Sequence, residues 1–259
     1  MNDTPPLIMV GFRGFVAPKG VRINYIPPND MKIQGGMVAW VDAYWFKIEN
    51  SVIEMRCKLK EPLGSKNVSE LYMECYDIIR ATTDLFSFAM GIGLTPILDT
   101  FLDEKGNPKD AIAGDKNLSS LCTSYKVDAP FEEILILILR ERLASMALND
   151  LIISITMTNY GQVNCGRAVE SLRSLLADPG KDRGIEWSQM QEKLNVDEAY
   201  LKFITDHSVD ARHGRRDKVK FEVLAELNRR AWVLLDRFIA YRGNGNQPLL
   251  PDRFPLLKG

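Results

Sequence analysis

Residues 206–214, DHSVDARHG, bring together side chains that could bind a phosphate and move a proton. The segment contains both histidines of the chain, His207 and His213, and the charged residues Asp206, Asp210 and Arg212. An imidazole titrates near neutral pH, and a guanidinium is a permanent forked cation. His213 could therefore act as a general acid or base while Arg212 holds a phosphate, which is the chemistry of phosphodiester cleavage by an internal 2′-hydroxyl.

The residues around this pair extend the candidate site. Arg215 and Arg216 add positive charge, and together with His207 and Asp206 they are candidate substrate-binding residues. The same letters also have a structural interpretation, because cations and a glycine at the end of a helix satisfy its last carbonyl groups and take the left-handed turn. The sequence alone leaves both interpretations open.

A second charged group lies in the stretch CGRAVESLRSLL, where Arg167, Glu170 and Arg173 follow one another at intervals of three on one predicted helical face. On a solvated face these residues would attract one another only weakly. If the face turns inward instead, Glu170 could hold Arg212 or His213 in place, with Arg167 as a further supporting residue.

The amino-terminal part of the chain has the pattern of strands. Over the first ~65 residues apolar and polar side chains alternate, and the short Asn50-Ser51 connection predicts a hairpin. A helix is expected at about residues 68–90, followed by a strand and a turn.

From Asp128 onward helical periodicity replaces the alternation. A long helix is expected from about residue 130 to 155, because Leu135, Leu139 and Leu143 begin a ridge at intervals of four, and its apolar run at 134–139 is predicted to be buried. Further helices are expected at about 162–177, 186–194, 197–207 and 217–241, the last opening on Asp217.

These patterns predict an α+β protein with two domains. A β-rich mixed domain with one long helix is expected at residues 1–127, an antiparallel helical bundle at 128–242 and an extended tail at 243–259.

The composition excludes several classes of protein. Thirty-three basic and 34 acidic residues leave a net charge of −1, so no global charge favours nucleic acid or an anionic membrane. Four cysteines lie far apart without CxxC or Cys/His spacing, so we expect neither a disulfide framework nor a metal or other cofactor. Without an export signal or an apolar run of about 18 residues, the sequence predicts a cytoplasmic protein with no membrane partner.

The order of AVESLRSLL, W-S-x-M-x-x-x-L, ARHG and a long closing helix resembles the helical carboxy-terminal region of HEPN-superfamily proteins, in particular the ApeA-like and MauJ-like groups. The resemblance covers roughly residues 130–242. It implies a helical bundle, and active members of the superfamily are metal-independent, often dimeric ribonucleases. Their motif places an arginine five to seven residues before a histidine. With His213 as that histidine, these positions hold Ser208, His207 and Asp206.

The resemblance therefore implies a HEPN-like protein that recognises RNA or a nucleotide through Arg212, His213 and Arg215, with weak or lost ribonuclease activity. It also implies a homodimer formed through the helical bundle. The alternative is a non-catalytic protein-interaction or scaffold module in which the Arg-His-Gly segment only closes a helix. A third hypothesis is a small-molecule enzyme whose pocket between the domains is lined by aromatic residues such as Trp40, Tyr44 and Trp45.

Overall fold

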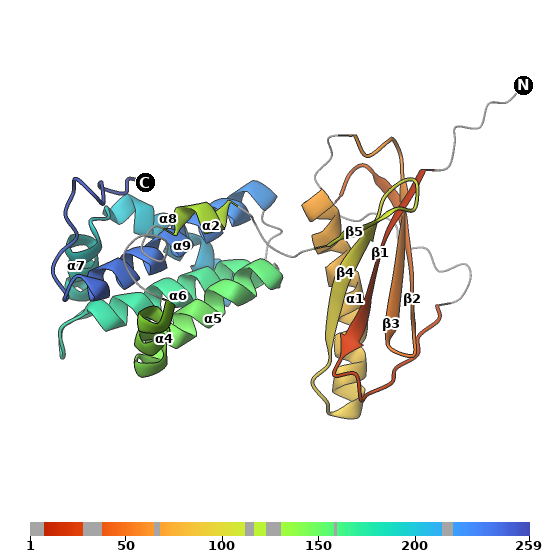
Figure 1. Ribbon diagram of the computed structural model, residues 1–259, viewed down its shortest axis with the longest axis horizontal. Coiled ribbons are helices and arrows are strands. Elements are labelled where there is room, and N and C mark those ends of the chain that lie inside the picture. Colours follow the sequence, from red (N-terminus) through yellow and green to blue (C-terminus); the bar gives the residue numbers. More distant parts are fainter. Residues whose placement is uncertain are drawn as a thin grey trace, which may run out of the picture. The chain divides into compact units, whose positions relative to one another are not determined.

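The protein is of the α+β class and consists of two compact units. The computed structural model describes residues 8–27, 38–64, 68–111, 117–122, 131–157, 160–213 and 220–259. The units are Met1–Ala113, which holds an antiparallel sheet and one long helix, and Gly114–Gly259, which is helical (Figure 1). The division thus falls ahead of the boundary predicted near residue 127.

The sheet of the first unit contains five strands in the described part of the chain. They are β1 (Ile8–Ala17), β2 (Val41–Glu49), β3 (Val52–Leu59), β4 (Thr95–Leu102) and β5 (Pro108–Asp110), in the order β2-β3-β1-β4-β5. Every neighbouring pair is antiparallel, and β1 carries a register shift at Arg13/Gly14 on its β4 side. The predicted hairpin at Asn50 and Ser51 is confirmed, and both residues have positive φ angles, of 50° and 64°.

Helix α1 (Val68–Met90) covers one face of this sheet, as the side-chain alternation requires. Phe12 of β1 packs edge-on against Tyr72 of α1, and the Sγ atoms of Cys57 and Cys75 lie 3.4 Å apart in the core. Tyr44, one of the aromatic residues considered for a pocket, is only 1% exposed and belongs to this core.

The second unit is built from helices in its described part. They are α2 (Leu118–Leu121), α4 (Phe131–Arg140), α5 (Arg142–Thr156), α6 (Gly161–Leu176), α7 (Arg183–Leu194), α8 (Glu198–Arg212) and α9 (Phe221–Gly243). Helix α6 packs against α5, α7, α8 and α9, and its Ala168, Val169 and Leu172 are fully buried. Aspartate caps begin two of the helices: Asp182 accepts from Gly184 N at 2.8 Å, and Asp197 accepts from Tyr200 N at 2.7 Å.

The prediction of a single long helix from 130 to 155 is wrong, because the helix is interrupted at Glu141. This residue has an extended conformation, with φ −102° and ψ 91°, and its carbonyl oxygen accepts from Ala144 N and Ser145 N at the start of α5. The break separates the expected ridge into two parts with different surroundings. Ala147 and Leu151 of α5 are fully buried, whereas Leu135 and Leu139 of α4 are exposed.

The prediction that the helix before the candidate segment 206–214 ends near residue 207 is also wrong. Helix α8 continues to Arg212, so Asp206 and His207 lie inside it and His213 is its carboxy-terminal cap. The predicted start of the last helix at Asp217 lies outside the described residues, and α9 is described from Phe221.

Past α9 the chain forms neither a helix nor a strand over residues 247–259, apart from an isolated bridge between Leu257 and Val196. This segment, the strap, is fixed to the helices by backbone hydrogen bonds, such as Asp197 N to the Leu257 carbonyl at 2.9 Å, and by the side chain of Arg237 of α9. The Arg237 side chain donates to the carbonyl oxygens of Leu194 and Asn195 at 2.8 Å and of Pro255 at 2.6 Å.

Candidate functional site

Arg212, the predicted phosphate-binding cation, reaches from α8 to α6. Its Nη2 donates to Ser208 Oγ at 2.6 Å, one helical turn earlier, and its Nη1 lies 3.0 Å from Glu170 Oε2. Ser208 is fully buried, and a β-carbon at Gly166 would collide with Ser208 and with the guanidinium. The small residue on α6 and the buried hydroxyl on α8 therefore allow the two helices to approach around the arginine.

Glu170 lies between two arginines. Its Oε1 is 2.9 Å from Arg183 Nη2, at the start of α7, and its other oxygen holds Arg212. The Arg183 side chain is 69% exposed, while that of Arg212 is 28% exposed and that of Glu170 is 25% exposed. Glu170 thus lies against Arg212, as expected if its face of the helix turns inward. We call Glu170, Arg183, Ser208 and Arg212 the clasp.

Arg167, the second predicted supporting residue, does not join the clasp. It extends to α5, where its Nε lies 3.5 Å from Asp150 Oδ2. The Asp150 side chain is 4% exposed, and burial raises the pKa of this carboxyl, with the Arg167 charge opposing the shift. The predicted face of three charged residues is therefore divided between different partners.

His213 is exposed at the end of α8, where its backbone N–H donates to the carbonyl oxygens of Val209 and Asp210 at 3.1 Å. His207 faces Phe203 on the same helix: its Nδ1 is 2.7 Å from the Phe203 carbonyl oxygen, and the two rings are 4.7 Å apart. Asp206 is exposed on α8.

The candidates Arg215 and Arg216 lie outside the described residues. The proposed site is therefore brought together only in part, as an exposed imidazole that follows an arginine already bound to two protein groups. The terminal nitrogens of Arg212 serve packing between α6 and α8, and a phosphate would have to compete with Glu170 for Nη1. Within the described ranges, no group of three or more His, Cys, Asp or Glu side chains is arranged to hold a metal ion.

A second surface with functional character lies on α4, and sequence reasoning missed it. The apolar run at 134–139 was predicted to be buried, but of α4 only Ile138 is buried. Four large apolar side chains of this helix are exposed, by 56%, 42%, 46% and 71%: Phe131, Leu135, Ile136 and Leu139. We call these four residues the α4 patch.

The charges that flank the α4 patch have opposite signs at its two ends. Glu132 and Glu133 lie in the first turn of α4, and Arg140 lies in its last turn. All three are exposed. An apolar surface with such a charged border is typical of a site where another protein binds.

Fold and site together define an α+β protein with a sheet unit and a helical unit in which ion pairs join the helices. Residues 131–243 of the helical unit match a family described as the "Domain of unknown function (DUF8168) C-terminal domain". No curated protein matches the chain. No solved structure matches it either. In the described part of the chain, no helix is long and apolar enough to cross a membrane.

Proposed function

We propose that the helical unit is a non-catalytic protein-interaction module that pairs with a second copy of this chain through the α4 patch. The observation that carries this proposal is the exposure of Phe131, Leu135, Ile136 and Leu139 on a helix whose neighbours in the same unit are closely packed. Phe131, Leu135 and Leu139 recur at intervals of four, so they form one stripe along α4.

A second copy fits this stripe because the charges of α4 complement themselves. In an antiparallel pair of α4 helices, Glu132 of one copy lies near Arg140 of the other, and the same contact occurs twice. Leu135 then lies near the two-fold axis. The helix dipoles are also favourably aligned in this arrangement.

The strength of this contact can be bounded. Full burial of a large apolar side chain contributes about 1.5–3 kcal/mol, so each half-exposed side chain of the patch contributes about 1 kcal/mol. Two copies bury eight such side chains, for about 8 kcal/mol, and this gain exceeds only the lower part of the association cost of about 4–15 kcal/mol, so the contact is a weak one. The pairing is therefore expected to depend strongly on protein concentration.

Light scattering coupled to gel filtration, run over a broad range of concentration, tests the proposal. We expect the mass to approach that of a dimer at high concentration, and Leu135→Lys with Leu139→Lys to keep the chain monomeric. Arg140→Glu should weaken pairing, because it places two carboxylates opposite each other. Adding Glu132→Arg to this variant should restore pairing, because the two charges are then exchanged and still attract each other.

Val209→Lys is the matched control, since Val209 is a 46% exposed apolar residue on α8. It should leave the association unchanged, and circular dichroism should show equal helix content in all variants. The proposal would be refuted if the chain were monomeric at every concentration. It would also be refuted if neither the lysine substitutions nor the charge exchange changed the dimerisation.

A second candidate function is recognition of RNA or a nucleotide by a HEPN-like bundle with weak or lost ribonuclease activity. It is favoured by His213, an exposed imidazole that directly follows Arg212, and by the exposed guanidinium of Arg183 on the other side of Glu170. The cytoplasmic location predicted from the sequence is part of this candidate.

Incubation of the purified protein with mixed RNAs in the absence of metal, beside His213→Ala, separates the two functions. Cleavage or binding that His213→Ala removes would support the second candidate, and equal background would remove it. If the clasp is structural, Arg212→Ala lowers the melting temperature and leaves RNA binding at background.

A further inference from the structure

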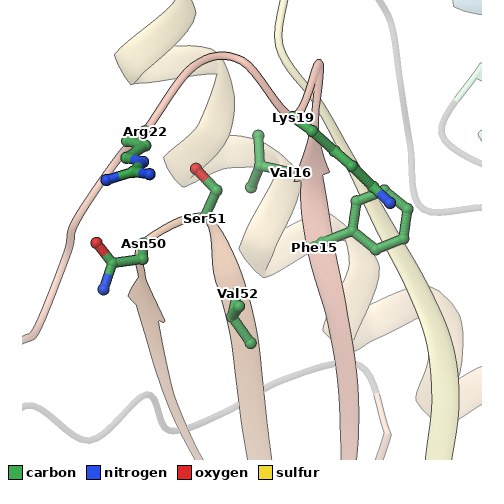
Figure 2. Close-up of a pocket in the computed structure, with 7 residues that line it drawn as sticks. All are labelled: Phe15, Val16, Lys19, Arg22, Asn50, Ser51 and Val52. Carbon is green, nitrogen blue, oxygen red and sulfur yellow. The ribbon is translucent and has the colours of Figure 1, made fainter.

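The sheet unit contains a hollow that is independent of the surfaces described above. It has a volume of about 540 Å³ and lies where the end of β1, the following loop and the β2–β3 turn meet (Figure 2). Phe15, Val16 and Val52 supply its apolar wall, and Lys19, Arg22, Asn50 and Ser51 supply its polar groups. Among the residues that the structure describes, no acidic one lines it.

The loop that carries both cations is fixed to the turn by Ser51. The Ser51 hydroxyl donates to the Val21 carbonyl at 2.9 Å and accepts from Ile23 N at 3.0 Å, while its backbone N–H donates to the Ile23 carbonyl at 3.0 Å. Asn50 N donates to Asn24 Oδ1 at 2.6 Å. A left-handed φ of 64° at a serine is retained here because its side chain makes these bonds, and the result is a preorganised loop.

The two cations mark different parts of the hollow. Arg22 and Asn50 lie on one side, and Lys19 lies on the other, where its Nζ is 5.3 Å from the centroid of the Phe15 ring (Figure 2). Within the described ranges, neither Lys19 nor Arg22 forms an ion pair with an acidic side chain. Two positive charges on one hydrogen-bonded loop, with no acidic partner in the part of the chain that the structure describes, favour an anionic ligand.

We propose that this hollow binds the phosphate of a nucleoside phosphate, with the attached ring on its apolar wall. The guanidinium fork of Arg22 and the amide of Asn50 can donate to phosphate oxygens, and Lys19 adds a second charge. Phe15 and Val52 offer apolar contact for the base, and Lys19 lies over the Phe15 ring, at the same side of the hollow. The volume lies within the range of about 300–1,000 Å³ that small-molecule sites occupy.

A free nucleotide and the 5′-phosphorylated end of a nucleic-acid strand present the same chemistry, so the experiment includes both. Isothermal titration and amide NMR shifts of the full chain are measured with nucleoside monophosphates, the matching nucleosides, inorganic phosphate, and a short oligoribonucleotide with or without its 5′-phosphate. We expect the monophosphate to bind more tightly than the nucleoside or inorganic phosphate, and to shift the amides of residues 19–23 and 50–52. Tighter binding of the 5′-phosphorylated oligonucleotide would assign the same site to strand ends.

Variants separate this site from general attraction between charges. Arg22→Gln should weaken binding about tenfold or more, because it removes a charge-assisted hydrogen bond, and Phe15→Leu should reduce the preference for the nucleotide over inorganic phosphate. Arg56→Gln is the matched control, since Arg56 is an exposed arginine of the same sheet that does not line the hollow. Equal losses in Arg22→Gln and Arg56→Gln, or equal binding of nucleoside and nucleotide, would overturn the proposal.

Discussion

Asp150 is an unfavourably placed charge of the helical unit. Its carboxylate is almost fully buried, its Oδ2 accepts no hydrogen bond, and its ion pair with Arg167 is long, at 3.5 Å, with a partner that is 52% exposed. Because burial raises the pKa of Asp150, the fold disfavours its ionised form. This cost is absent below the ordinary pKa of 3.8, grows as the pH rises through the folded pKa, and is fully present above it.

Asp150→Asn should therefore raise the free energy of unfolding at pH 7, by about 1 kcal/mol, because a buried charge with an incomplete partner is replaced by a neutral group of the same shape. The gain should disappear below about pH 4, where the wild-type carboxyl is protonated as well. Urea denaturation at both pH values measures the difference. Asp206→Asn, at an exposed position of α8, serves as the control. A loss of stability at pH 7 would mean that the pair with Arg167 outweighs the burial.

At the scale of residues, the sequence named charged side chains as candidates but could not tell which of them contact one another. Arg212 and Glu170 were both candidates, and Glu170 was expected to touch Arg212 only if its helical face turned inward. The contact joins α8 to α6, and nothing in the spacing of either segment indicates it. Gly166 was the available signal, because a glycine inside a helical pattern often marks close packing.

At the scale of elements, local chemistry predicted the first unit well. The Asn50-Ser51 hairpin and the helix at 68–90 depend on neighbouring residues, and both were found where expected. The break at Glu141 could not be predicted, because neither proline nor glycine marks it. At the break, Arg242 Nη2 of α9 lies 3.2 Å from Glu141 Oε1. This contact joins residues far apart in the sequence, so local patterns do not indicate it.

The strap offers a test of how much one buried side chain, that of Arg237, contributes beside other hydrogen bonds, such as those from Asn195 Nδ2 to the Phe254 carbonyl at 2.8 Å and from Asp197 N to the Leu257 carbonyl at 2.9 Å. Burial lowers the pKa of Arg237, yet its guanidinium satisfies three carbonyl oxygens at the end of α7 and in the strap. Arg237→Met should lower the free energy of unfolding by about 3 kcal/mol, because the buried carbonyl of Leu194 loses its charged donor and the carbonyls of Asn195 and Pro255 each lose one hydrogen bond. It should also speed proteolysis within residues 247–257, and both effects are measurable by urea denaturation and limited digestion.

Lys258→Met, at an exposed cation of the same strap, controls for the change in charge. It should leave both the free energy of unfolding and the proteolysis rate near wild type. If Arg237→Met behaved in the same way, the hydrogen bonds of Arg237 would not be what holds the strap.

At the scale of the whole molecule, the reactivity of the cysteines can show how stable each unit is, because both units contain them. Cys57 and Cys75 lie in the core of the sheet unit, Cys165 lies in that of the helical unit, and Cys122 is partly exposed. None of the four forms a disulfide. Burial raises the pKa of Cys165 to about 12 and that of Cys75 well above its usual value, so at pH 8 almost no thiolate is present at either.

Titration of the native protein with a thiol reagent at pH 8 should therefore label one cysteine per chain, and denaturant should release the other three. Cys122→Ser should abolish the native reaction, because it removes the only thiol within reach among those described. Identification of the modified peptides assigns each thiol to its unit, so the two cores are read separately. Rapid labelling of Cys75 would mean that the sheet unit opens readily, and rapid labelling of Cys165 would mean the same for the helices that carry the clasp.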